Sequence, residues 1–187
     1  MNQHAQPLAT GGSDPAPFWV RWIDGTLVVT SITLALANLV VMFLSLMAEV
    51  VVRYLTNQGM GWPSEMPNIL FPWLVMSGVV LGAQKGQHIA VTALLGVLGR
   101  TGNRLLLLSL QLVVAATFFY LAYIGLDVLE ITGSEEFPVT GITAFWAYLA
   151  LIAGFTGLGI TAMTTFVRLL LANDPLAVRA HLIKDDV

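Results

Sequence analysis

The sequence predicts an all-α membrane protein with four membrane-spanning helices. Of its 187 residues, 57% are hydrophobic and only 10% are charged, whereas an ordinary soluble domain is about a quarter charged. The mean hydropathy of the chain is +0.81. The charged residues are also unevenly placed and leave four long apolar runs between them. Because crossing a bilayer takes roughly 20 apolar residues, four runs of this kind predict four spans.

The chain begins with a polar segment, residues 1–17, that is rich in small residues, Pro and Gly. It lacks the basic stretch followed by an apolar stretch that is typical of a secretory signal peptide. Few of its side chains could be buried in a core. We therefore expect a flexible cytoplasmic tail here.

Four runs without a charged side chain follow, at residues 25–48, 66–84, 105–126 and 137–167. In lipid a backbone must satisfy its own hydrogen bonds, so each run is expected to form a helix. The fourth run contains Pro138, and its helix is expected to begin near Thr140. These runs predict a four-helix membrane domain over residues 18–171, followed by a cytoplasmic C-terminal tail at 172–187.

The basic residues predict how the chain is oriented. With the N-terminus inside, seven basic residues face the cytoplasm and one faces out. The inner set is Arg21, Lys85, Arg100, Arg104, Arg168, Arg179 and Lys184, and the outer one is Arg53. Membrane proteins keep Lys and Arg on the cytoplasmic side. Both termini are therefore expected to be cytoplasmic.

The connection between the second and third spans, residues 84–102, is apolar but too short to cross. Four of its apolar residues recur at the helical spacing i, i+3, i+4, i+7, namely Val91, Leu94, Leu95 and Leu98. This pattern predicts a short amphipathic helix lying in the membrane interface. The same pattern is also compatible with a docking element for another subunit, and the sequence leaves both interpretations open.

Several kinds of chemistry find no support in the sequence. There is no Cys, and the three His residues are scattered over two tails and a loop, so no pair can clamp a haem or a metal ion within the helices. No basic patch for nucleic acid is present. The spans carry no Asp, Glu, Lys, Arg or His, and their isolated polar residues are expected to hydrogen-bond between helices. We predict no catalytic, cofactor or metal site, and no enzymatic activity.

Charged and aromatic residues border the loop between the first two spans. Glu49 and Arg53 are four residues apart, with Glu first, which favours an ion pair on a helix surface. Trp62 is suited to the membrane interface, and Glu65 lies in the first turn of the next helix, where its charge complements the helix dipole. Membrane anchoring with helix capping, or contact with a partner protein, explains this group equally well.

Small residues recur at every fourth position in two of the spans. One set is Gly78, Gly82 and Gly86, and the other is Ala153, Gly157 and Thr161. This spacing lets two helix backbones approach closely. We therefore expect helix packing along both stripes.

Two stretches carry a resemblance to a known family. They are "RYLTNQGMGWPSEM" and, after an apolar span, "GAQKGQHIAV". Together they resemble the small, DctQ-type membrane subunit of tripartite ATP-independent periplasmic (TRAP) transporters. The matching residues are Arg53, Tyr54, Trp62, Glu65, Gly82, Lys85, Gly86, His88 and Ile89. The sequence departs from the family pattern at Met66 and Thr92, where acidic residues are common.

The resemblance implies an accessory role in the inner membrane of a bacterium. In such systems a periplasmic solute-binding protein captures a solute, often an organic acid. A large membrane subunit then moves the solute, driven by a sodium gradient, and the small subunit serves as a fixed scaffold in the lipid. From the residue patterns and the resemblance together, we expect contacts with partners or the interface at Glu49, Arg53, Trp62, Glu65, Gly78, Gly82, Lys85, Gly86 and His88.

Two other functions remain as alternatives. A self-contained carrier or channel, assembled as a homo-oligomer, requires polar residues aligned on one face of a span, and the sequence shows only single ones. A membrane anchor of a respiratory enzyme requires His ligands within two spans, and the spans contain none.

Overall fold

The computed structural model describes residues 17–84 and 100–171, and these contain four long helices. They are α1 (Phe18–Thr56), α2 (Trp62–Gln84), α4 (Arg100–Thr132) and α5 (Phe145–Leu171). All four are long and apolar enough to cross a membrane. The expected fold class of four spanning helices is therefore confirmed. The expected interfacial segment falls on residues 85–99, outside the described part of the chain.

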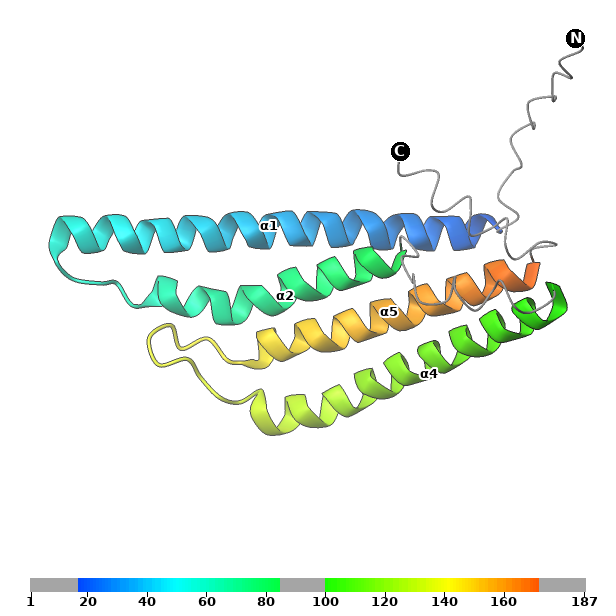
Figure 1. The fold of residues 1–187 in the computed structure, drawn as a ribbon. Coiled ribbons are helices and arrows are strands. Elements are labelled where there is room, and N and C mark those ends of the chain that lie inside the picture. Colours follow the sequence, from blue (N-terminus) through cyan, green and yellow to red (C-terminus); the bar gives the residue numbers. More distant parts are fainter. Residues whose placement is uncertain (1–16, 85–99, 172–187) are drawn as a thin grey trace, which may run out of the picture.

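The four helices lie side by side in the order α1, α2, α5, α4 (Figure 1). α1 packs against α2, α2 against α5, and α5 against α4, so that α1 and α4 form opposite edges of the layer. Both described connections, residues 57–61 and 133–144, lie at one end of the layer, which we call the hairpin end. The opposite end holds the start of α1 and the end of α5. An open layer of this kind leaves most helix surface available to lipid or to another protein.

α1 is the longest helix and the least covered one. Its 39 residues span about 58 Å at 1.5 Å per residue, well beyond a hydrocarbon core of about 30 Å. Apart from Val20, its buried residues are Ser31, Asn38 and Ser45, which are seven positions apart. Three polar residues of α1 are therefore aligned on one buried seam, which corrects the expectation of single ones, whereas Thr26, Thr30 and Thr33 of the same helix are exposed. Small side chains at this seam allow α1 to approach its neighbour α2 closely.

The contact between α2 and α5 depends on glycine. A Cβ atom added to Gly154 would lie 2.7 Å from Cβ of Met76, and one added to Gly157 would lie 3.2 Å from Cγ2 of Val80. The expected close packing along the fourth span is therefore present. Gly157 and Thr161 of the expected stripe are buried, whereas Ala153 is exposed and the neighbouring Gly154 is buried in its place.

The fourth span begins five residues later than expected, at Phe145 instead of Thr140. The preceding residues form a tight turn, in which the N–H of Phe137 donates to the carbonyl oxygen of Ile142 at 3.0 Å. Gly141 lies in the left-handed region, with φ of 65°, which a helix cannot contain. The charge-free run thus includes part of the hairpin-end connection.

Candidate functional site

The structure brings four of the expected site residues together at the hairpin end. Glu49 and Arg53 lie in the last turns of α1, and Trp62 and Glu65 lie in the first turn of α2. Lys85, Gly86 and His88 fall outside the described residues.

Glu65 fastens the connection between α4 and α5 to the start of α2. Its side chain is 7% exposed and accepts three hydrogen bonds. The N–H of Val139 donates to Oε1 at 3.0 Å, and the N–H and the hydroxyl of Thr140 donate to Oε2 at 2.9 and 2.8 Å. Hydrogen bonds to an ionised group are about twice as strong as neutral ones. The position of Glu65 in the first turn was predicted from the sequence, whereas its distant partners were not.

Glu49 holds the shorter connection in a similar way. Its Oε2 accepts a hydrogen bond from the N–H of Met60 at 3.1 Å. The expected ion pair with Arg53 is wrong, since no ion pair joins these two residues in the described part of the chain. The physical reason is the turn at Asn57, which has a φ of 55° and brings the following backbone over Glu49. That backbone offers a nearer donor, and Arg53 remains exposed.

An ion pair that the sequence analysis missed joins α1 to α5 at the opposite end. Nη2 of Arg168 lies 2.7 Å from Oδ2 of Asp24, and the hydroxyl of Thr164 donates to Oδ1 of Asp24 at 2.8 Å. The side chains of Arg168 and Asp24 are only 11% and 14% exposed. Both residues border charge-free runs on the same expected side of the membrane. This shared position was the one feature of the sequence from which the pair could have been predicted.

Three further hydrogen bonds tie neighbouring helices together. Nε1 of Trp73 donates to the carbonyl oxygen of Trp146 at 2.9 Å, and Nε2 of Gln84 donates to the hydroxyl of Thr161 at 2.9 Å. Both bonds connect α2 with α5. At the opposite end, Arg104 of α4 donates to the carbonyl oxygen of Leu170 at 2.6 Å. A cation is stabilised at this position by the negative end of the α5 dipole.

The glycine stripe of α2 has a different environment from that of α5. Gly78 and Gly82 are exposed, and a Cβ atom added to either one would meet nothing within 4 Å. Their stripe therefore faces away from the packed helices of this chain.

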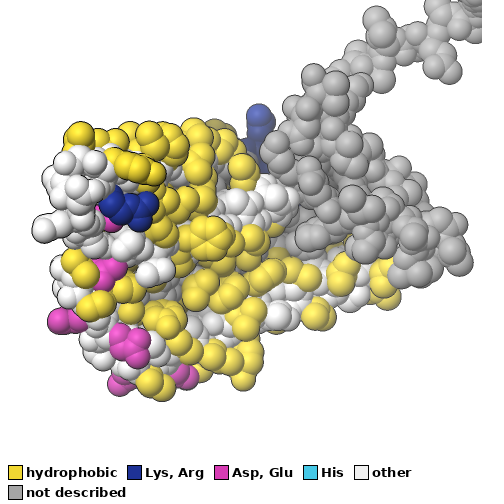
Figure 2. Space-filling model, turned by 60° about the vertical axis from the view of Figure 1, so that its left-hand side comes forward, with side chains coloured by type: hydrophobic (Ala, Val, Ile, Leu, Met, Phe, Trp, Pro, Cys, Tyr) yellow, Lys and Arg dark blue, Asp and Glu magenta, His cyan; other side chains and the backbone are white. Residues whose placement is uncertain are grey.

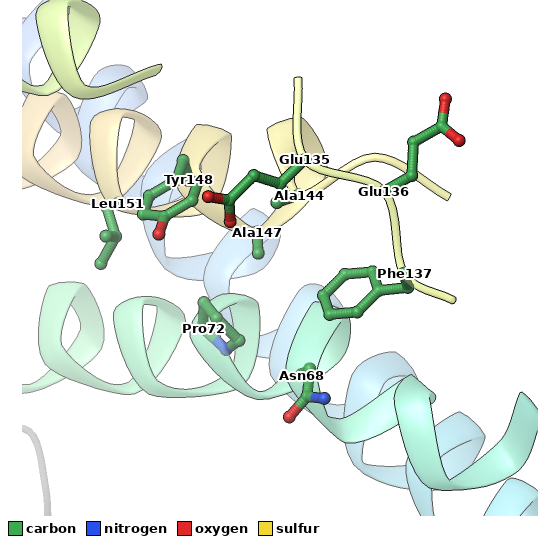
Figure 3. Close-up of a pocket in the computed structure, with 9 residues that line it drawn as sticks. All are labelled: Asn68, Pro72, Glu135, Glu136, Phe137, Ala144, Ala147, Tyr148 and Leu151. Atoms are coloured by element: carbon green, nitrogen blue, oxygen red, sulfur yellow. The ribbon is translucent and has the colours of Figure 1, made fainter. Parts of the chain in front are cut away.

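A cavity of about 380 Å³ opens at the hairpin end, between α2, the 133–144 connection and the start of α5. Figure 3 shows the side chain of Glu135 directed over this cavity toward Tyr148, whereas Glu136 points away from it. The ring of Phe137 and the side chains of Asn68 and Pro72 form the opposite wall.

The charged side chains gather at the ends of the molecule. Figure 2 shows acidic groups at the hairpin end and hydrophobic side chains along the visible flank of the helices. Within residues 17–84 and 100–171, no group of three or more His, Cys, Asp or Glu side chains could hold a metal ion.

Four long apolar helices with charged groups at their ends define a multi-pass membrane protein. The family model of the DctQ component of tripartite ATP-independent periplasmic transporters matches residues 42–172, more than two thirds of the chain. The chain therefore belongs to this family of small TRAP membrane subunits, which is a family of transporter components and not of enzymes. Membership places it in the inner membrane.

Similar proteins agree with this assignment. A putative TRAP transporter small permease protein of Haemophilus influenzae is 25% identical over 119 residues, 64% of this chain and 72% of that protein. The ectoine TRAP transporter small permease protein TeaB of Halomonas elongata is 27% identical over 146 residues, 77% of this chain and 75% of that protein. The uncharacterized protein y4mM of Sinorhizobium fredii is 32% identical over 124 residues, 66% of this chain, but this chain spans only 23% of its length.

Proposed function

We propose that this chain is the fixed scaffold subunit of a TRAP transporter. A large membrane subunit, which packs against this chain, moves the solute. A periplasmic solute-binding protein delivers the solute to it. The observation that carries this proposal is the absence of charged side chains from residues 25–48, 66–84, 105–126 and 137–167. A path for ions or charged solutes through the chain would need such groups near the middle of the bilayer.

The polar groups within the spans support the same proposal, because many bond to their own helix. The amide of Asn38 donates to the carbonyl oxygen of Leu34 at 2.7 Å. Three hydroxyl groups, those of Thr33, Ser109 and Thr117, donate to carbonyl oxygens three or four residues earlier. The buried polar seam of α1 faces the neighbouring helix. These groups are therefore not arranged to line a transport path, which the alternative of a homo-oligomeric carrier requires.

In the proposed orientation the hairpin end faces the periplasm and both termini face the cytoplasm. Seven of the eight basic residues then lie inside, as is usual for membrane proteins. A reporter enzyme that works only in the periplasm should be active when fused after Glu135 and inactive when fused at the C-terminus. The reverse pattern of activity would contradict this orientation.

The exposed glycine stripe of α2 is the proposed contact with the large subunit. Gly78 and Gly82 leave room for the backbone of a partner helix. Lys85, Gly86 and His88, which follow in the chain, are the other residues proposed for contact with a partner. Lipid surrounds the remaining apolar surface.

The residues of the hairpin end serve the periplasmic side in this proposal. Glu49 and Glu65 keep the two connections in place, while Arg53 and Trp62 are exposed there for contact with headgroups or a partner. The driving force is a sodium gradient and the solute is a small organic acid, as the resemblance to the family implies.

Deleting the chain should abolish uptake even when the large subunit and the binding protein are present. Gly82→Leu should leave the chain in the membrane, because Leu favours the bilayer. It should nevertheless lower both the recovery of the large subunit with a tagged small one and the uptake of labelled solute in proteoliposomes with a sodium gradient.

The matched control is Gly25→Leu, at an exposed glycine of α1 where an added Cβ also meets nothing within 4 Å. It should leave both measurements unchanged. Uptake by this chain alone would contradict the scaffold function and support the homo-oligomeric carrier. Normal recovery with Gly82→Leu would contradict only the glycine contact.

A further inference from the structure

The cavity at the hairpin end contains polar groups that have no partner within the described part of the chain. No hydrogen bond or ion pair reaches the carboxylate of Glu135, the hydroxyl of Tyr148 or the side-chain amide of Asn68 from residues 17–84 or 100–171. Pro72 also lines the cavity, and it lacks the N–H that would bond the carbonyl oxygen of Asn68 in a regular helix. The side-chain acceptors of Glu135, Tyr148 and Asn68 therefore border one space, where Glu135 and Asn68 are open to solvent.

The walls of the cavity add an apolar surface to these acceptors. Phe137, Pro72 and Leu151 line it together with two Ala residues. Its volume of about 380 Å³ lies within the range of cavities that bind small ligands or side chains, roughly 300 to 1,000 Å³. An apolar wall beside a carboxylate suits a ligand with a hydrocarbon stem and a cationic head, as in Arg and Lys.

The surroundings of the cavity also favour a positively charged ligand. Three more carboxylates, those of Asp127, Glu130 and Glu136, belong to the end of α4 and the 133–144 connection. Figure 2 shows the acidic groups gathered at this end. Arg53 is also exposed at this end, so the field is predominantly negative, and such a field attracts a basic protein surface and orients it before contact.

We propose that this cavity receives an Arg or Lys side chain of the periplasmic solute-binding protein. The identity of this partner rests on the proposed function. The stem of the cationic residue lies against Phe137 and Pro72, and its head pairs with Glu135 while donating to Tyr148 and to the carbonyl oxygen of Asn68. The cavity thus fixes where the binding protein docks on the small subunit.

The test measures the affinity of labelled solute-binding protein for nanodiscs that contain both membrane subunits. Glu135→Lys should weaken binding at least about tenfold, and raised salt should weaken wild-type binding more than binding by this variant. Ala147→Trp fills the cavity without changing any charge and should weaken binding by a similar factor. Tyr148→Phe removes only the hydroxyl and should cost about threefold.

Glu136→Lys is the matched comparison, since it makes the same charge change at the neighbouring residue, which borders the cavity but directs its carboxylate away from it. Because Glu136 belongs to the surrounding acidic field only, this variant should weaken binding by a clearly smaller factor than Glu135→Lys does. Equal effects of the two Lys variants, with none from Ala147→Trp, would overturn the proposal in favour of a diffuse acidic field. Binding of free arginine to the chain without binding protein, abolished by Glu135→Lys, would overturn it in favour of a small-molecule site.

Recovery of the large subunit with each tagged variant separates this inference from the function on which it rests. If the wild-type chain fails to recover the large subunit, the scaffold function is wrong and this inference falls with it. If recovery is normal and Glu135→Lys leaves docking unchanged, only the cavity proposal is wrong.

Discussion

α1 and α5 are both apolar membrane helices, yet the chain buries them to very different extents. In the most apolar 18-residue stretch of each helix, 11% of the residues of α1 are buried within the chain, compared with 44% of those of α5. In water an exposed face such as that of α1 would be costly, but in lipid an apolar side chain gains little by moving from lipid to protein. Apolar character therefore predicts that both helices enter the membrane, and it does not predict which of them is central.

The difference lies in how the two helices are held. α5 lies between α2 and α4, and its Gly154 and Gly157 bring its backbone against the side chains of α2. α1 lies at an edge, where it packs on α2 through its seam of Ser31, Asn38 and Ser45. Its link to α5 includes the ion pair of Asp24 and Arg168. Close packing should thus contribute most to the stability of α5 in the layer, and polar links should contribute most to that of α1.

Breaking the ion pair should give the largest effect on stability. Arg168→Met leaves the largely buried carboxylate of Asp24 without its cation, and should lower the free energy of unfolding by about 3 kcal/mol. Adding Asp24→Asn to this variant should recover more than half of the loss, because no buried charge then remains. The measurement is reversible unfolding in mixed detergent micelles.

Arg21→Met serves as the control for this experiment. Arg21 is also near the start of α1, but it is exposed, so its loss should change stability by less than about 0.5 kcal/mol. If the double variant is as unstable as Arg168→Met alone, the contribution of Arg168 comes from its other contacts and not from the pair.

Gly154→Ala tests the close packing of α5 and should have a smaller effect. The added methyl group would lie 2.7 Å from Cβ of Met76, an atom fixed to the backbone of α2, so one of the helices must shift. We expect a loss of about 1 to 2 kcal/mol in the same unfolding measurement. Gly82→Ala adds the same group where nothing lies within 4 Å and should not destabilise the isolated chain. Equal stabilities of the two variants would mean that α5 is not held by close packing.

The spans could be predicted from the sequence because the membrane imposes a simple rule on composition. A run of some 20 residues without charge has to be a helix in lipid, and each of the four runs lies within or overlaps one of the helices. The start of α5 was misplaced because this rule does not distinguish a span from an apolar connection beside it. Pro138 and Gly141 gave a local signal for the turn, and Glu65 of a different helix completes it.

The polar links were harder to predict because their partners are distant in the sequence. Asp24 and Arg168 are 144 residues apart, and neither belongs to a recognisable motif. Their pairing requires that α1 and α5 approach each other at the end of α2. The periodicity of apolar residues along a helix does not predict such an approach. For Glu49 a partner four residues away was a reasonable expectation, but a turn in the backbone supplied a different one.

A double-mutant cycle on Glu49 and Arg53 should show the smallest effect of all. Since the carboxylate of Glu49 bonds to the N–H of Met60 and not to Arg53, the two side chains should contribute independently. Glu49→Gln weakens the hold on the 57–61 connection and should cost about 1 kcal/mol, whereas Arg53→Ala should cost less than about 0.5 kcal/mol. The double variant should show their sum, with a coupling energy below about 0.5 kcal/mol. A larger coupling energy would support the ion pair between Glu49 and Arg53 that the sequence favours. The end of α1 would then be held by its own side chains and not through the connection to α2.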